Sequence, residues 1–281
     1  MRRLRLLLIF VLLLGALGID AFLIEPNSLR IRYETITSPK IPLSMDNYTI
    51  LIFSDLHYNN FTNKQRALKM VDMINSIDAN TVIFLGDLYD HPTQNPVSDE
   101  TQKELAEILT DIHAKYGKFA VLGNHDYESA AAAEMVTKTL NNANFEVYVN
   151  GNQNLYFGGE DYIKLIAIDS LALGDPDIPR AFKGVSEDDF NLVITHCPDI
   201  FDTIDSNLAD LVLAGHSHGG QIRVPFLISI VTSYGADNYQ YGIHFRNSSQ
   251  LDITNGVGNT YINARFNSPA EVVVYRLVHS Q

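Results

Sequence analysis

The sequence is poor in cysteine and in basic residues, and each shortage excludes a class of protein. Cys197 is the only cysteine, so no disulfide can form within the chain, which excludes a disulfide-stapled secreted module. The 20 lysines and arginines are outnumbered by 33 aspartates and glutamates, giving a net charge of -13. Because nucleic-acid backbones are bound by basic patches and none is visible, we expect no nucleic-acid partner.

Internal repeats, low-complexity tracts and long linkers are also missing from the sequence. What remains is 281 residues with 46% hydrophobic and 19% charged residues, which predicts one large globular domain with a sizeable core. An anionic substrate remains compatible with this acidic chain if something other than surface charge supplies a positive field.

A long hydrophobic run begins the chain. Three arginines within residues 2–5 precede an unbroken apolar stretch over residues 6–19, and four more apolar residues follow Asp20. This length predicts an uncleaved membrane anchor of about 20 residues, whereas a cleaved signal peptide would have a poor cleavage site at residues 16–18. With either interpretation the arginines stay cytoplasmic. We therefore predict a single-pass protein of the cell membrane with an extracytoplasmic catalytic domain, or a secreted protein if the segment is cleaved.

Residues beyond the anchor alternate between two kinds of pattern. Short apolar runs that end in polar residues predict strands, and apolar residues at helical spacing predict the helices between them. The predicted strands lie within residues 48–57, 81–90 and 118–127, and the helices within 64–77, 100–116 and 128–143. This alternation is typical of parallel strands flanked by helices. Parallel strands share one carboxyl edge, so their polar ends should converge there.

The second half of the chain is richer in predicted strands. Residues 145–169 contain Asn-Gly and Gly-Gly turns between apolar runs, and two further runs, within 190–198 and 209–218, end in histidines. Short strands and turns are expected from Gln221 onward. Two stacked mixed sheets with helices outside account for the whole pattern. We predict a signal-anchor segment over 1–24, a juxtamembrane segment over 25–46 with three prolines, and a catalytic domain over 47–281.

Five of the nine histidines lie just beyond apolar runs, together with carboxylate and amide side chains. Such clusters of histidine and carboxylate are what divalent metals require. Residues two apart in an extended segment point the same way, so Asp55 with His57, and His216 with His218, are each expected to aim two ligands at one site. Glycines at 215, 219 and 220 permit unusual backbone angles and leave room beside a metal.

These residues, taken in order, resemble the calcineurin-like metallophosphoesterases. The motifs are Asp55-x-His57, Gly86-Asp87-x-x-Asp90, Gly123-Asn124-His125-Asp126, His196 and Gly215-His216-Ser217-His218. Segments 24–31, 215–225 and 255–277 are similar to the bacterial branch of the family that carries an N-terminal membrane segment. The resemblance implies an α/β fold, a four-layer αββα sandwich of two mixed sheets, here preceded by a transmembrane helix.

The resemblance also implies a binuclear metal centre. One ion would be held by Asp55, His57, Asp87 and His218, and the other by Asp87, Asn124, His196 and His216, with Asp87 bridging. Mixed oxygen and nitrogen ligands suit Mn, Fe, Zn or Ni without choosing among them. Two divalent ions bring more charge than the two carboxylates cancel, which supplies the positive field that the acidic chain lacks.

The implied chemistry is hydrolysis of a phosphoester or pyrophosphate bond by a metal-activated water. His125 would protonate the leaving group while Asp126 orients its ring; the alternative is that His125 only supports the metal site. Asp90 is expected to support a metal ligand or to cap its loop, and not to be catalytic. The anchor suggests a small-molecule, nucleotide or lipid substrate of the membrane or cell envelope, a UDP-diacylglucosamine-type pyrophosphatase being one example. The competing hypothesis is a non-catalytic, metal-containing scaffold that binds envelope phosphates.

Overall fold

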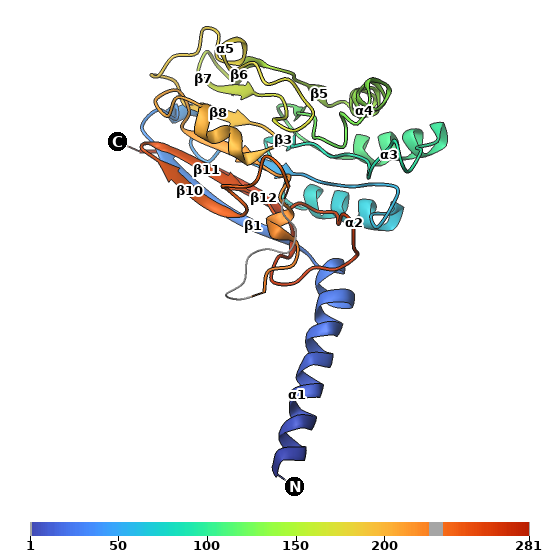
Figure 1. The fold of residues 1–281 in the computed structure, drawn as a ribbon. Helices are drawn as coiled ribbons and strands as arrows, with labels where there is room; N and C mark the ends of the chain where they lie inside the picture. The colour runs from blue at the N-terminus through green and yellow to red at the C-terminus, as the bar shows by residue number, and fades with distance from the viewer. Residues whose placement is uncertain (1, 225–232, 281) are drawn as a thin grey trace.

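Two six-stranded sheets stack face to face in the computed structural model, which describes residues 2–224 and 233–280 (Figure 1). The first sheet has the order β1 (Leu29–Ser38), β12 (Ala270–His279), β2 (Thr49–Phe53), β3 (Thr81–Phe84), β4 (Lys118–Ala120) and β5 (Glu146–Val147). The second has the order β10 (Gly242–Arg246), β11 (Ser249–Ile253), β9 (Leu211–Ala214), β8 (Asn191–Ile194), β7 (Tyr162–Ala167) and β6 (Gly151–Tyr156).

Both sheets are mixed, as predicted. Strands β2 to β5 are parallel, and β12 joins them antiparallel to β2. In the second sheet β7, β8, β9 and β11 are parallel, while β6 and β10 pair antiparallel at the two edges. The chain therefore carries parallel carboxyl edges in both sheets, which is the arrangement that can gather strand-end side chains at one place.

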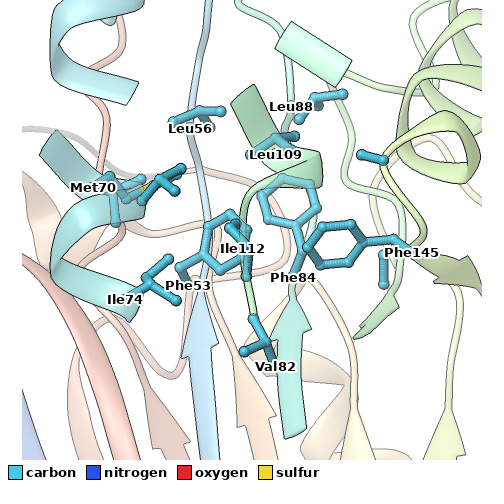
Figure 2. Close-up of a cluster of buried hydrophobic side chains, with 14 of the residues drawn as sticks. Phe53, Leu56, Met70, Ile74, Val82, Phe84, Leu88, Leu109, Ile112 and Phe145 are labelled. Atoms are coloured by element: carbon cyan, nitrogen blue, oxygen red, sulfur yellow. The ribbon is translucent and has the colours of Figure 1, made fainter. Parts of the chain in front are cut away.

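Alternation along the strands divides each sheet between two layers. In β2, Leu51 and Phe53 face helices α2 (Lys64–Asn75), α3 (Asp99–Thr110) and α4 (Ala130–Asn142), where they join the cluster in Figure 2. Ile50 and Ile52 face the other way and pack between the two sheets. Because side chains of a strand alternate between faces, one apolar run supplies both cores.

The second sheet uses the same alternation. Leu213 of β9 packs against the first sheet, whereas Val212 and Ala214 face outward. That outer face is covered by the short helix α5 (Ile178–Ala181) and by the 3-10 segment η4 (Pro198–Thr203), whose Phe201 is fully buried there. The layers are thus helices, sheet, sheet and helical segments, which confirms the predicted αββα sandwich.

The N-terminal segment is one long helix that projects from the domain. Helix α1 (Arg2–Ile19) has no buried residue and continues through η1 (Asp20–Ile24) and η2 (Glu25–Asn27) (Figure 1). Residues 2–27 are long and apolar enough to cross a membrane, judged by length and composition.

Residues 25–46 are more than a connection between the apolar N-terminal helix and the domain. Leu29–Ser38 form the edge strand β1, which pairs in parallel with β12 along all ten residues. The charged residues of β1 interrupt the apolar pattern that predicts a strand, although charges are common on edge strands. The first sheet therefore begins before residue 47, the start predicted for the catalytic domain. The expected short strands after Gln221 appear as β10 to β12, while residues 225–232 lie outside the described residues.

Candidate active site

Every candidate ligand follows the carboxyl end of a strand in one of the two sheets. The loops after β2, β3 and β4 come from the first sheet, and those after β8 and β9 come from the second. In this order they carry Asp55 and His57, Asp87, Asn124 and His125, His196, and His216 and His218. The structure brings all of them to one place because the carboxyl ends of both sheets open toward the same cavity.

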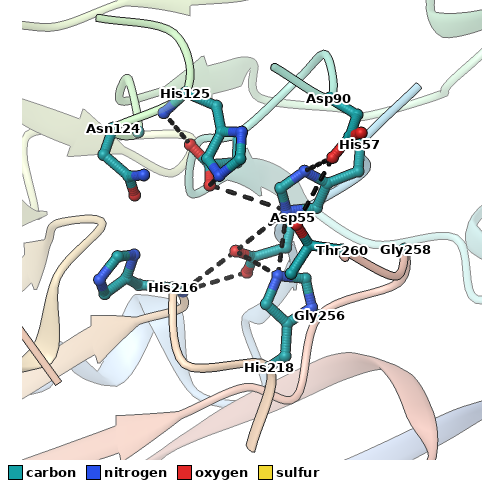
Figure 3. A network of polar contacts seen from close by, with 12 residues as sticks. Asp55, His57, Asp90, Asn124, His125, His216, His218, Gly256, Gly258 and Thr260 are labelled. Carbon is teal, nitrogen blue, oxygen red and sulfur yellow. Dashed lines mark hydrogen bonds and ion pairs between the residues drawn. The ribbon is translucent and has the colours of Figure 1, made fainter. Parts of the chain in front are cut away.

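Asp55, His57 and His218 form the first cluster (Figure 3). The Nε2 atoms of His57 and His218 lie 3.0 Å apart. Asp55 Oδ1 is 3.6 Å from His218 Nε2 and 4.0 Å from His57 Nε2. All three side chains are buried, so their ligand atoms face one another and not solvent.

Asp87, His196 and His216 form the second cluster. His196 Nε2 lies 3.3 Å from Asp87 Oδ2, 3.2 Å from His216 Nδ1 and 3.1 Å from Asn124 Oδ1. Asp87 Oδ2 is also 3.7 Å from His57 Nε2 of the first cluster. The Asp87 carboxylate therefore lies between the two clusters, where a bridging ligand would be.

The outer nitrogens of two of these rings fix which nitrogen carries the proton. His196 donates its Nδ1 proton to the carbonyl of Leu85 at 2.7 Å, and His216 donates its Nε2 proton to the carbonyl of Tyr234 at 3.0 Å. In the neutral rings, His196 Nε2 and His216 Nδ1 are then lone pairs that face each other and the Asp87 carboxylate. Nitrogen lone pairs and carboxylate oxygens that converge in this way can act as the ligands of a cation.

The pKa shifts of His196 and Asp87 also indicate a site that favours a cation. Burial by itself lowers the pKa of His196, but the adjacent Asp87 carboxylate outweighs burial and raises that pKa well above its usual value. Asp87 in turn has a lowered pKa, because the neighbouring histidines outweigh the burial of its carboxylate. The pocket therefore favours positive charge, which a metal ion supplies more completely than a proton.

Left-handed backbone, not extended strand, aims the ligands. The φ angles are 56° at Asp55, 45° at His57, 61° at Asp87, 70° at His216 and 51° at His218. The expectation that Asp55 with His57, and His216 with His218, lie on extended segments is therefore wrong. Positive φ is strained for residues with a Cβ and is found at functional sites that the surrounding structure holds in place.

Two glycines leave the space that the carboxylates occupy. A Cβ on Gly123 would lie 2.1 Å from Asp87 Oδ1, and one on Gly215 would lie 2.6 Å from Asp55 Oδ2. No side chain fits at either distance. The predicted role of Gly215, making room beside the metal ligands, agrees with this contact.

Asp90 supports His57. Its Oδ1 lies 3.2 Å from His57 Nδ1, on the side of the ring away from the first cluster. Carboxylates that hold the outer nitrogen of a metal-binding histidine orient the ring and raise its basicity. Asp90 thus has the supporting position that the sequence predicted.

His125 lies at the edge of the clusters with its Nε2 atom 3.8 Å from Asp87 Oδ2 (Figure 3). The backbone N–H of His91 donates to His125 Nδ1 at 3.2 Å, so the neutral ring carries its proton on Nε2, toward the cavity. Burial lowers the pKa of His125 to about 4. His91 was not among the predicted site residues, and its ring packs against that of His125 with centroids 3.9 Å apart.

Asp126 does not orient His125. One carboxylate oxygen of Asp126 accepts the backbone N–H groups of Asp87 at 2.9 Å and Gly123 at 2.8 Å, and the other accepts that of Leu88 at 2.9 Å. The predicted contact between Asp126 and the His125 ring is therefore wrong. Asp126 instead ties the loop after β3 to the loop after β4, and the backbone of His91 holds the His125 ring.

Replacing Asp126 with alanine is expected to lower the free energy of unfolding by about 3 kcal/mol or more, because three buried N–H groups lose their acceptor. Denaturant titration of the metal-free protein measures this loss. Asp72→Ala, on an exposed face of α2, is the control and should change stability by less than about 0.5 kcal/mol. Wild-type stability in Asp126→Ala would contradict the role assigned to this carboxylate.

The ligand atoms open into a cavity of about 430 Å³. Its polar wall includes Asp87, Asn124, His125, His216, His218 and Thr260. Three large side chains of the wall are also strongly exposed: Leu173 at 67%, Tyr234 at 71% and Tyr261 at 69%. The cavity is therefore polar at its base and has an apolar mouth.

The chain is similar to several known proteins. A family model described as calcineurin-like phosphoesterase matches residues 48–220. The uncharacterized metallophosphoesterase YkuE of Bacillus subtilis is 30% identical over 264 residues, which cover 94% of this chain and 90% of the relative. The UDP-2,3-diacylglucosamine pyrophosphatase LpxG of Chlamydia trachomatis is 24% identical over 91% of each chain. A dimetal phosphatase of Danio rerio has a TM-score of 0.48 and 11% identity, covering 75% of this chain and 88% of its own.

Proposed function

The chain belongs to the calcineurin-like phosphoesterase family and is thus a metal-dependent phosphoric ester hydrolase, and we propose that it works with two divalent ions on a membrane-associated phosphoester. One observation carries the binuclear proposal: histidine nitrogens and carboxylate oxygens converge in two adjoining clusters with the Asp87 carboxylate between them. This arrangement suits two cations, because each cation would be bound by the histidine nitrogens and carboxylate oxygens of one cluster.

We assign the candidate side chains to two ligand sets that share Asp87. The first set is Asp55, His57, Asp87 and His218, and the second is Asp87, Asn124, His196 and His216. Mn, Fe, Zn and Ni all suit these oxygen and nitrogen donors. When bound, such ions polarise the phosphoryl group and make water a nucleophile at neutral pH.

His125 is proposed to act on the leaving group. Its Nε2–H faces the cavity because the His91 amide occupies Nδ1, so the neutral ring can donate a hydrogen bond to an oxygen that becomes negative as the phosphoester bond breaks. Transfer of a proton to that oxygen would require the imidazolium form of His125, which a bound phosphate anion favours. Its neighbour Asp87 accepts the His125 backbone N–H at 2.8 Å, which holds the donor beside the metal ligands.

The apolar mouth of the cavity supports an amphiphilic substrate. Leu173, Tyr234 and Tyr261 offer contact to an alkyl chain while the phosphate lies at the polar base. The apolar N-terminal helix would keep the cavity near a bilayer, on the extracytoplasmic side by the distribution of arginines. We propose a lipid-linked phosphoester or pyrophosphate, a class that includes the substrate named for the similar LpxG protein.

Metal reconstitution tests this function. Full-length protein in detergent, stripped with chelator and refilled, should bind two equivalents of Mn, Fe, Zn or Ni and regain hydrolysis of phosphomonoesters, phosphodiesters or pyrophosphates. Calorimetric titration and elemental analysis give the stoichiometry. A single equivalent at full activity would overturn the binuclear proposal.

Replacing Tyr261 with serine tests the apolar mouth. We expect KM to rise about tenfold for a phosphoester with a long alkyl chain, because contact worth about 1.5 kcal/mol is lost, with little change for a short-chain analogue. Tyr156→Ser is the control, since Tyr156 is exposed on edge strand β6 and is not among the residues of the cavity wall. Equal changes for both substrates would contradict an alkyl-binding mouth.

A further inference from the structure

Glu25, at the end of the apolar N-terminal helix, is buried against a distant part of the chain. Only 7% of its surface is exposed. Its carboxylate accepts the backbone N–H of Asn267 at 2.9 Å and that of Ser268 at 2.7 Å. Burying a charged carboxylate is unfavourable unless it is hydrogen-bonded. The two hydrogen bonds to Asn267 and Ser268 therefore fix Glu25 to the domain.

Ser268 carries the contact onward to the metal site. Its hydroxyl donates to the carbonyl of His218 at 2.8 Å, so two hydrogen bonds separate the Glu25 carboxylate from a proposed ligand. His218 has a strained φ of 51° and is followed by Gly219, where a Cβ would lie 2.7 Å from Ser268 Oγ. The backbone of this ligand is therefore held by the residue that Glu25 holds.

Arg265 makes a second connection between the helix and the site. Its backbone N–H donates to the carbonyl of Ala21 at 2.9 Å. Its guanidinium, fully buried, donates to the carbonyls of Ser268 at 2.8 Å and Asn255 at 2.9 Å, and also to that of Gly258. The loop it organises, residues 255–268, thus contacts the end of the N-terminal helix.

The same loop contacts the first metal ligand. Gly258 donates its N–H to the carbonyl of Asp55 at 2.8 Å. A Cβ on Gly256 would lie 3.0 Å from Asp55 Oδ2, and Figure 3 shows the loop that carries Gly256 and Gly258 next to the first cluster. Loop 255–268 therefore supports two members of the first cluster, Asp55 and His218, and is itself supported by residues 21 and 25.

From these contacts we infer that the last turns of the N-terminal helix belong to the scaffold of the metal site, with Glu25 as a positioning residue for His218 and Asp55. The inference rests on the proposed binuclear centre and adds that its two halves differ. The first cluster depends on the helix end, whereas no contact between Glu25 and the second cluster, Asp87, His196 and His216, is found among the described residues.

The test is metal titration of full-length Glu25→Ala in detergent, using Mn²⁺ alone as the probe. Outer partners of metal ligands typically contribute about 10–100-fold in metal affinity, so one of the two binding steps should weaken by that factor while the other keeps its affinity. Asn27→Ala is the matched control, because Asn27 lies in the same short helix, is exposed, and donates only to the Leu23 carbonyl. It should bind both ions normally.

Glu25→Gln retains one acceptor oxygen and should lie between the wild type and Glu25→Ala. The melting temperature of the metal-free protein is expected to fall, because two buried N–H groups lose their acceptor, so the difference between the two binding steps, and not stability, tests the positioning role. Wild-type affinity for both ions in Glu25→Ala overturns the inference, as does equal weakening of both steps. A wild type that binds one ion refutes the binuclear proposal instead.

Discussion

Replacing Asp87 with asparagine is expected to lower kcat/KM by about a thousandfold or more and to reduce the bound metal below two equivalents. Asp87 Oδ2 is the oxygen within 3.3 Å of His196 Nε2 and 3.7 Å of His57 Nε2, so it belongs to both proposed ligand sets. Losing its charge removes several kcal/mol of metal-dependent stabilisation, and each 1.36 kcal/mol is tenfold in rate.

Asparagine is the informative substitution at position 87. It preserves the volume and an acceptor for the His125 backbone N–H, which now bonds Asp87 Oδ1 at 2.8 Å, so the loops should stay in place. Asp78→Asn is the control, because Asp78 is exposed and pairs with Lys115 at the surface. Elemental analysis of both variants and kinetics with a nitrophenyl phosphate check the prediction. Two full equivalents of metal in a folded Asp87→Asn would show that this carboxylate does not bridge.

Replacing His125 with alanine should leave both metal ions bound and slow hydrolysis by about 10²–10⁴-fold, the usual contribution of a general acid. The loss should depend on the leaving group. An alkoxide leaves poorly without a proton, whereas a nitrophenolate is stable as an anion and needs little help. The alkyl ester should therefore lose clearly more rate than the aryl ester of the same phosphate.

Leaving-group dependence separates proton donation from a supporting role for His125. The comparison needs substrates for which the chemical step limits kcat, since product release would mask the effect. His113→Ala, an exposed histidine outside the cavity wall, is the control. Equal losses on the two esters with both metals retained would mean that His125 positions the phosphate. Loss of a metal ion would mean that it is a ligand or supports one.

Most of the fold was predictable because it is written in local patterns. Apolar runs such as 49–53 and 81–84 end in polar residues, and helical spacing between them implies crossovers, so parallel sheets follow. The edge strand β1 was not predictable in this way. Its alternating charged residues are typical of a polar connection, and it becomes a strand only because β12, far away in the chain, supplies a partner.

The candidate ligands could be proposed from the sequence, since residue type and position after a strand are local properties. Asp55, Asp87 and His196 each follow an apolar run, and the shared carboxyl edges bring them together. How each side chain is aimed did not follow. The left-handed φ of 61° at Asp87 depends on the loop that Asp126 and Gly123 complete, and neither contact can be deduced from spacing.

Only the tertiary structure decided which residues support the site. His91 holds the ring of His125, a role that the motif assigned to the adjacent Asp126, because the folded loops place the His91 amide beside that ring. Glu25 bonds Ser268 across 243 residues of sequence. Such contacts exist only once both sheets have formed, whereas hydrophobic periodicity is present in the unfolded chain. The sequence by itself thus determined the layers and the candidate ligands, and the tertiary structure determined the orientation of these side chains and their connection to the N-terminal helix.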